Sequence, residues 1–147
     1  MRLPMLLDWS QSPDEAIRYY SGRATYRQNF DVASPPTQAP LFLSLGEVKE
    51  MARVRLNGHD LGVVWCPPWH VRLPAGILTE MANKLEIEVV NFWPNRLIGD
   101  AKLPPDQRRT KTNITKFEDR KGDARYTTLM PAGLLGPVTL RTTTVIK

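Results

Sequence analysis

The chain has 147 residues, which is typical of one domain and long enough to bury a core without disulfide bonds. Its single cysteine, Cys66, excludes an internal disulfide and a multi-cysteine zinc site. The net charge is +5, and no apolar run approaches the roughly 20 residues that cross a bilayer. Residues 1–8 carry no apolar signal core, so we expect export only of a longer parent protein with a signal upstream, which would be periplasmic or secreted.

The first predicted elements are a helical turn and a strand. Pro13 and the acidic residues that follow it are typical of a helix N-terminus, so a short helical turn is expected within 10–20. A strand follows, whose apolar face is interrupted by Gln28 and carries Ala24, Tyr26, Phe30 and Val32. The proline-rich segment 34–40 predicts a loop, and 41–45 predicts another strand.

Residues 52–65 predict a β-hairpin. Apolar residues occupy every second position from Ala52 to Leu56, as in a half-buried strand. Asn57-Gly58 is the strongest short hairpin signal, because both central residues of a type I′ turn need positive φ. By continued alternation the second strand would turn inward Leu61, Val63 and Trp65. Trp65 is therefore expected in the core.

The rest of the chain predicts an all-β fold. Further strands are expected at 69–73, 84–90 and 137–146. Between them, segment 91–136 shows no clear period and is expected to be a long irregular stretch. Short strands joined by turns, with almost no helical period, indicate a single β-sandwich domain over 1–147, with 1–20 as a lead-in.

Several pieces of the sequence together resemble a known domain. They are 20–26, 43–48, 52–58, 61–65, 83–89, 91–100 and 131–138. The most specific are NFWPNRLIGD at 91–100 and PAGLLGPV at 131–138. The chain resembles the galactose-binding-like jelly-roll (sugar-binding) domain of family 2 glycoside hydrolases. It resembles still more closely the C-terminal domain of bacterial family 106 α-L-rhamnosidases. The resemblance implies a β-sandwich that accompanies a separate catalytic barrel, which alone needs about 250 residues.

A sugar-binding surface is predicted around segment 91–100. The apolar face of a pyranose packs on an aromatic ring, while nearby polar groups bond the hydroxyls. The candidate carbohydrate-binding residues are Trp93, Asn95, Arg96, Asp100, Asn91, Trp69 and Tyr126.

The sequence gives little support to catalysis or to a cofactor. Glu86 and Glu88 share one strand face, whose ordinary role is the solvated side of a sheet. His59 and His70 are the only histidines and lack a spaced acid motif for zinc, and no nucleophile motif is present. Related jelly rolls often hold a structural calcium ion, but no aspartate-rich ligand loop is visible, so no cofactor is expected.

Three functions remain open. The first is a non-catalytic sugar-binding module, with a rhamnose- or galactose-containing carbohydrate and the catalytic domain of a parent enzyme as partners. The second is a structural docking domain with no sugar affinity. The third is a basic polyanion-binding module at 102–125, which holds eight basic and four acidic residues. Nucleic acid is not the expected polyanion, because acids are interspersed and no nucleic-acid motif occurs. No membrane partner is expected.

Overall fold

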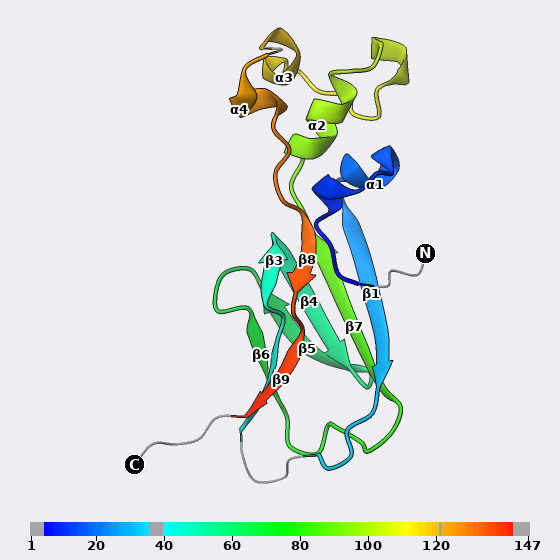
Figure 1. The fold of residues 1–147 in the computed structure, drawn as a ribbon, viewed down its shortest axis with the longest axis vertical. Helices are drawn as coiled ribbons and strands as arrows, with labels where there is room; N and C mark the ends of the chain where they lie inside the picture. The colour runs from blue at the N-terminus through cyan, green and yellow to red at the C-terminus, as the bar shows by residue number, and fades with distance from the viewer. Residues whose placement is uncertain (1–4, 36–39, 121, 143–147) are drawn as a thin grey trace.

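The chain folds mainly into antiparallel strands (Figure 1). A computed structural model describes residues 5–35, 40–120 and 122–142. The strands are β1 (Arg23–Phe30), β2 (Leu41–Ser44), β3 (Glu47–Lys49), β4 (Met51–Leu56), β5 (His59–Val64), β6 (His70–Leu73), β7 (Asn83–Val90), β8 (Gly133–Gly136) and β9 (Thr139–Thr142). Parts of two predicted elements, 36–39 of the loop and 143–146 of the last strand, lie outside the described residues.

The strands form two facing layers. One is a four-stranded sheet in the order β1-β7-β4-β5, and the other combines the sheet β6-β2-β9 with the pair β3-β8. Between the layers lies one apolar core, whose fully covered members include Leu45, Val48, Ala52, Val54, Leu56 and Val89. The predicted all-β sandwich is therefore confirmed.

Alternation explains the central strands. In β7, Leu85, Ile87 and Val89 are buried, while the intervening side chains face outward. The neighbouring β4 follows the same pattern, and its Val54 lies directly opposite Ile87. Burying one such side chain contributes about 1.5–3 kcal/mol, so the two strands hold much of the core.

The hairpin has the predicted turn but a different second strand. Asn57 has φ 51° and Gly58 has φ 82°, as the Asn-Gly signal requires. However, the β4–β5 register shifts next to Val54, where a β-bulge inserts one extra residue into β5. The alternation of β5 therefore reverses. The prediction that Trp65 is a core residue is wrong, because its side chain is 71% exposed.

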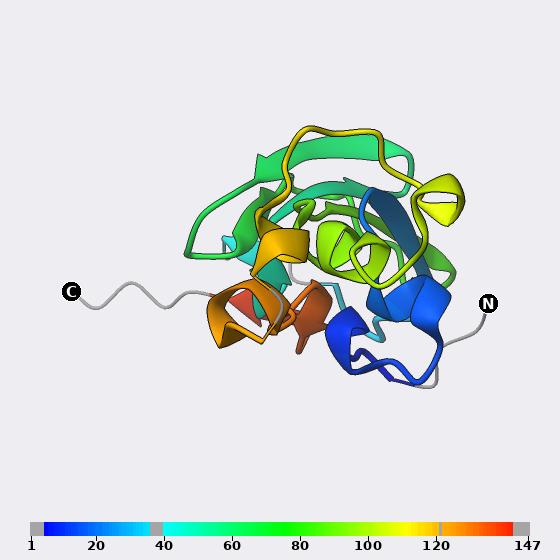
Figure 2. The same cartoon turned by 90° about the horizontal axis from the view of Figure 1, so that it is seen from above.

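At the end where β7 finishes, short helices extend beyond the sandwich (Figure 1). They are η1 (Trp9–Gln11), α1 (Glu15–Arg18), α2 (Pro94–Asp100), η2 (Pro105–Gln107), α3 (Lys116–Asp119) and α4 (Ala124–Thr127). We call residues 94–127 the helical cap. Figure 2 looks down on this end and shows α2 beside the N-terminal helices, with α4 set apart from them. The cap helices have only three to seven residues, too few to leave a helical period in the sequence.

The N-terminal lead-in is fixed to the sandwich. The predicted helical turn is α1, where Asp14 caps the helix by accepting a 2.8 Å hydrogen bond from Ala16 N–H. The Trp9 indole N–H donates to the Tyr26 hydroxyl at 2.6 Å. Burial raises the pKa of Tyr26, so its hydroxyl stays neutral and accepts this bond.

Candidate functional site

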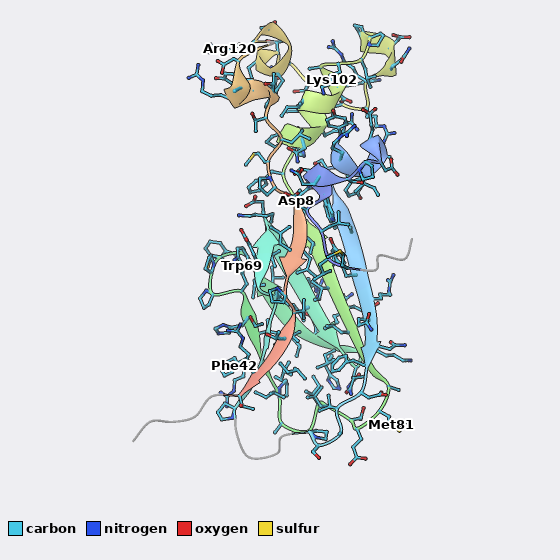
Figure 3. The ribbon with its side chains drawn as sticks, in the orientation of Figure 1. Asp8, Phe42, Trp69, Met81, Lys102 and Arg120 are labelled. Carbon is cyan, nitrogen blue, oxygen red and sulfur yellow. The ribbon has the colours of Figure 1, made fainter. Side chains whose placement is uncertain are left out.

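The predicted site residues lie mostly where the sandwich meets the helical cap. Asn91 directly follows β7, and Trp93 is the residue before α2. Within α2 lie Asn95, Arg96 and Asp100. Tyr126 belongs to α4, across the cap from α2, whereas Trp69 precedes β6 at the side of the sandwich (Figure 3).

The two asparagines hold backbone segments together. The Asn91 amide accepts from Gly22 N–H at 2.9 Å and donates to the Tyr20 carbonyl at 2.8 Å. The Asn95 amide donates to the Met130 carbonyl at 2.7 Å and accepts from Met130 N–H at 2.8 Å. Both side chains are buried. Their polar groups therefore satisfy the protein's own backbone, which fixes the cap on the sandwich.

Asp100 is also engaged inside the protein. Its Oδ2 accepts hydrogen bonds from the Thr110 backbone N–H at 2.8 Å and the Thr110 hydroxyl at 2.6 Å. Its Oδ1 lies 2.8 Å from Arg96 Nη2, an ion pair without hydrogen-bond geometry. Burial alone would raise the pKa of Asp100, but the Thr110 hydrogen bonds and the Arg96 charge outweigh it and hold the pKa below its usual value.

Trp93 presents an open ring. Its side chain is 61% exposed, and that of its neighbour Phe92 is 55% exposed. Pro94 at the first position of α2 fixes the backbone beside the ring. Trp93 is thus the predicted site residue whose aromatic surface is most open to a sugar.

The register places a second exposed indole at the same end of the sheet. Met51 begins β4 opposite Val90, the last residue of β7, and Ala52 lies opposite Val64, the last residue of β5. Trp65 therefore leaves β5 at the end where Phe92 and Trp93 leave β7. Alternation missed this surface tryptophan, although Gly62, which lies inside β5 with φ 93°, is the residue that marks the bulge.

The remaining aromatic candidates are less open. Trp69 is partly buried against the sandwich core. Tyr126 is partly buried and packs edge-on against Phe117, with ring centroids 6.1 Å apart. The structure thus separates the predicted set into an open ring at Trp93, two half-buried rings and a group of internally bonded polar side chains.

A groove of about 1040 Å³ lies elsewhere, between β1 and the β8–β9 side of the sandwich. Its lining is largely apolar and includes Tyr26, Phe30 and Leu140. None of the seven predicted site residues lines it.

Asp100 and Glu86 are both held by cations of the protein itself. Hydrolysis needs a protonated acid facing a second carboxylate across the sugar. Asp100 is the one buried carboxylate among the described residues, and its lowered pKa keeps it ionised. Glu86 lies on the outer sheet face and forms a 2.7 Å ion pair with Arg27. Within the described ranges, no three metal-ligating side chains come together, and no helix could span a membrane.

Comparison with known proteins gives two informative relatives, although no protein-family profile matches the chain. The structure of a rhamnosidase from Novosphingobium sp. PP1Y superimposes with a TM-score of 0.80 and 36% identity over 94% of this chain. A Formosa agariphila protein named "Putative beta-glucuronidase" is 37% identical, also over 94% of this chain. The resemblance to a glycoside hydrolase sandwich domain is confirmed.

The chain corresponds to a small part of these relatives. It spans 12% of the rhamnosidase chain and 13% of the Formosa protein. Its homologues are thus large glycoside hydrolases, and the matched segment is one small domain within them. This agrees with a non-catalytic accessory domain.

Proposed function

We propose that this chain is a non-catalytic, carbohydrate-binding module of a bacterial glycoside hydrolase, with an α-L-rhamnosidase-type parent enzyme. The observation that carries the proposal is the match over 94% of this chain to only 12% of a rhamnosidase. The catalytic domain of the parent enzyme is the expected protein partner.

The sugar surface of this proposal is centred on Trp93. An exposed indole offers a flat apolar face to the C–H side of a pyranose, and ring contacts of this kind contribute about 0.5–1.5 kcal/mol. One or two such contacts with a few hydroxyl hydrogen bonds correspond to a dissociation constant of about 1 mM. We therefore expect weak binding, with Phe92 widening the apolar surface and rhamnose- or galactose-containing carbohydrate as the ligand.

Calorimetric titration of the full chain with L-rhamnose, D-galactose and D-glucuronate tests this proposal. Trp93→Ala should abolish binding. Met81→Ala is the matched control, because Met81 is 73% exposed and lies at the opposite end of the sandwich (Figure 3). Absence of heat from the unmodified chain at millimolar sugar, or equal binding by Trp93→Ala, would contradict the proposal.

A structural docking domain is the second candidate. The exposed apolar side chains at the cap end of the sheet would also suit packing against a neighbouring domain: Met51, Val63, Trp65, Phe92 and Trp93. Analytical ultracentrifugation separates the two candidates. Self-association that Trp65→Ser and Trp93→Ser abolish, without any sugar binding, would favour docking.

A further inference from the structure

We propose that the helical cap binds the anionic groups of an acidic polysaccharide through Lys102, Lys116 and Arg120, which we call the basic surface. The inference rests on the proposed function, because it assumes a carbohydrate ligand. It adds the charge of that ligand and a second contact region beyond Trp93.

The first observation is a group of cations around Tyr126. Lys116 Nζ lies 5.9 Å from the ring centroid, and the guanidinium carbons of Arg120 and Arg125 lie at 5.1 and 5.8 Å. Attraction to the ring restrains these long side chains, which lowers the entropy cost of using them to bind a ligand.

A second group of cations surrounds Tyr19. Lys102 Nζ lies 5.1 Å from the ring centroid and donates to the Tyr19 hydroxyl at 2.7 Å. The guanidinium carbons of Arg18 and Arg96 lie 5.3 and 5.9 Å from the same centroid. One small apolar cluster joins Tyr19 to Leu97, Ile98 and Phe117 of the cap, and Tyr126 packs against it. The rings that the two groups of cations contact are therefore connected by one apolar cluster.

Half of these six cations are neutralised. Arg18 pairs with Glu15, Arg96 with Asp100 and Arg125 with Asp123, each at 2.8 Å. No such ion pair joins Lys102, Lys116 or Arg120 to a carboxylate among the described side chains. Lys102, Lys116 and Arg120 are thus restrained by aromatic contacts and form no ion pair with a described carboxylate, although the Arg120 charge also acts on Asp123. Figure 3 shows Lys102 and Arg120 on the cap, at the end of the molecule farthest from Met81.

The chemistry of the basic surface favours a saccharide. Lysine and arginine bond strongly to carboxylate and sulfate oxygens. Nucleic acid is disfavoured because acidic residues are interspersed with the basic ones over 102–125 and no nucleic-acid motif occurs there. Trp93 directly precedes α2, and Lys102 follows its C-cap Ala101, so the two side chains are separate contact points at the same end of the molecule.

Affinity electrophoresis of the full chain tests the inference with matched gels. In the first pair, one gel contains polygalacturonate and the other its fully methyl-esterified, neutral form. In the second pair, one gel contains dextran sulfate and the other dextran. A further gel contains duplex DNA.

The double variant Lys116→Gln/Arg120→Gln should lose roughly tenfold in affinity for an acidic polymer, as expected for two exposed ion pairs. The control Arg72→Gln/Arg141→Gln removes the same charge from exposed residues that flank Phe42 on the sandwich, and should bind normally.

Each result decides a defined point. Salt-sensitive retention by either acidic polymer over its neutral partner supports the inference, and the retaining gel identifies carboxylate or sulfate as the bound group. Equal retention by acidic and neutral polymers overturns it but leaves the proposed function intact. DNA retention as strong as polysaccharide retention overturns the saccharide assignment. Absence of retention by every polymer, together with no calorimetric sugar binding, overturns both proposals. Because the unmodified chain alone gives the acidic-against-neutral comparison, a variant that unfolds does not obscure the result.

Discussion

At the residue scale, the polar side chains near the cap mainly form hydrogen bonds and ion pairs within the protein. The side chains of Asn91, Asn95 and Asp100 can form hydrogen bonds either with sugar hydroxyls or with backbone amides. The sequence alone cannot distinguish these partners. The structure supplies the partners from distant segments, since Asn91 bonds across 69 positions and Asn95 across 35. Such contacts depend on the tertiary fold and leave no local pattern.

The first prediction concerns the contribution of Asp100 to stability at low pH. Its folded-state pKa is lowered, so its stabilising effect is complete above the unfolded pKa of about 3.9 and is lost as pH falls through the folded pKa. Asp100→Asn should reduce the free energy of unfolding at neutral pH by about 3 kcal/mol, because it leaves the Arg96 charge buried without its partner.

Urea denaturation between about pH 2 and 7 measures both effects. Asp100→Asn should show a smaller decline in stability below about pH 4 than the unmodified chain. Part of the decline should remain, because a hydrogen bond from Arg53 lowers the pKa of Asp60 to about 2. An unchanged pH dependence would show that Asp100 does not stabilise the cap as described.

The second prediction concerns Gly46, where the ends of β2 and β8 meet. Gly46 has φ +70°, and an added Cβ would lie 2.1 Å from the carbonyl carbon of Gly136. Because the carbonyl group of Gly136 is backbone, no side-chain movement can relieve the contact. Gly46→Ala should lower the free energy of unfolding by more than about 3 kcal/mol. Gly76→Ala, with a similar φ but open space around it, is the control and should cost about 1–2 kcal/mol. Equal losses would contradict this packing.

At the element scale, periodicity predicted most of the strands but missed the short β3 and β8 and the change of face in β5. The regular strands β4 and β7 need only alternation, and the turn needs only Asn57-Gly58, so both could be predicted locally. The bulge depends on how β5 pairs with its neighbour. One extra residue moved Trp65 from the expected core to the surface. The cap helices could not be predicted either, because they are short and held by contacts with other segments.

The third prediction tests this register directly. Trp65→Ala should change the free energy of unfolding by less than about 1 kcal/mol, because the side chain is 71% exposed. Leu85→Ala should cost about 2–5 kcal/mol, since Leu85 is 7% exposed in the core. Urea denaturation of the two variants compares them. A loss of stability for Trp65→Ala as large as that for Leu85→Ala would indicate that Trp65 is buried in the core, as uninterrupted alternation predicts.

At the scale of the whole molecule, the sandwich supports the cap end, where the side chains of both proposals lie. The exposed rings, the restrained cations and the clamps that hold α2 all lie there. The resemblance predicted the fold and the relationship to glycoside hydrolases, because the specific sequence pieces extend over nearly the whole chain. It could not predict which polar side chains face outward.

Nuclear magnetic resonance of the indole N–H signals tests the central claim most directly, because the chain has only four tryptophans. We predict that millimolar saccharide shifts the Trp93 signal and leaves Trp9, which is 5% exposed, unchanged. If the Trp93 signal stays still at saturating saccharide while the chain remains folded, the carbohydrate-binding account is contradicted.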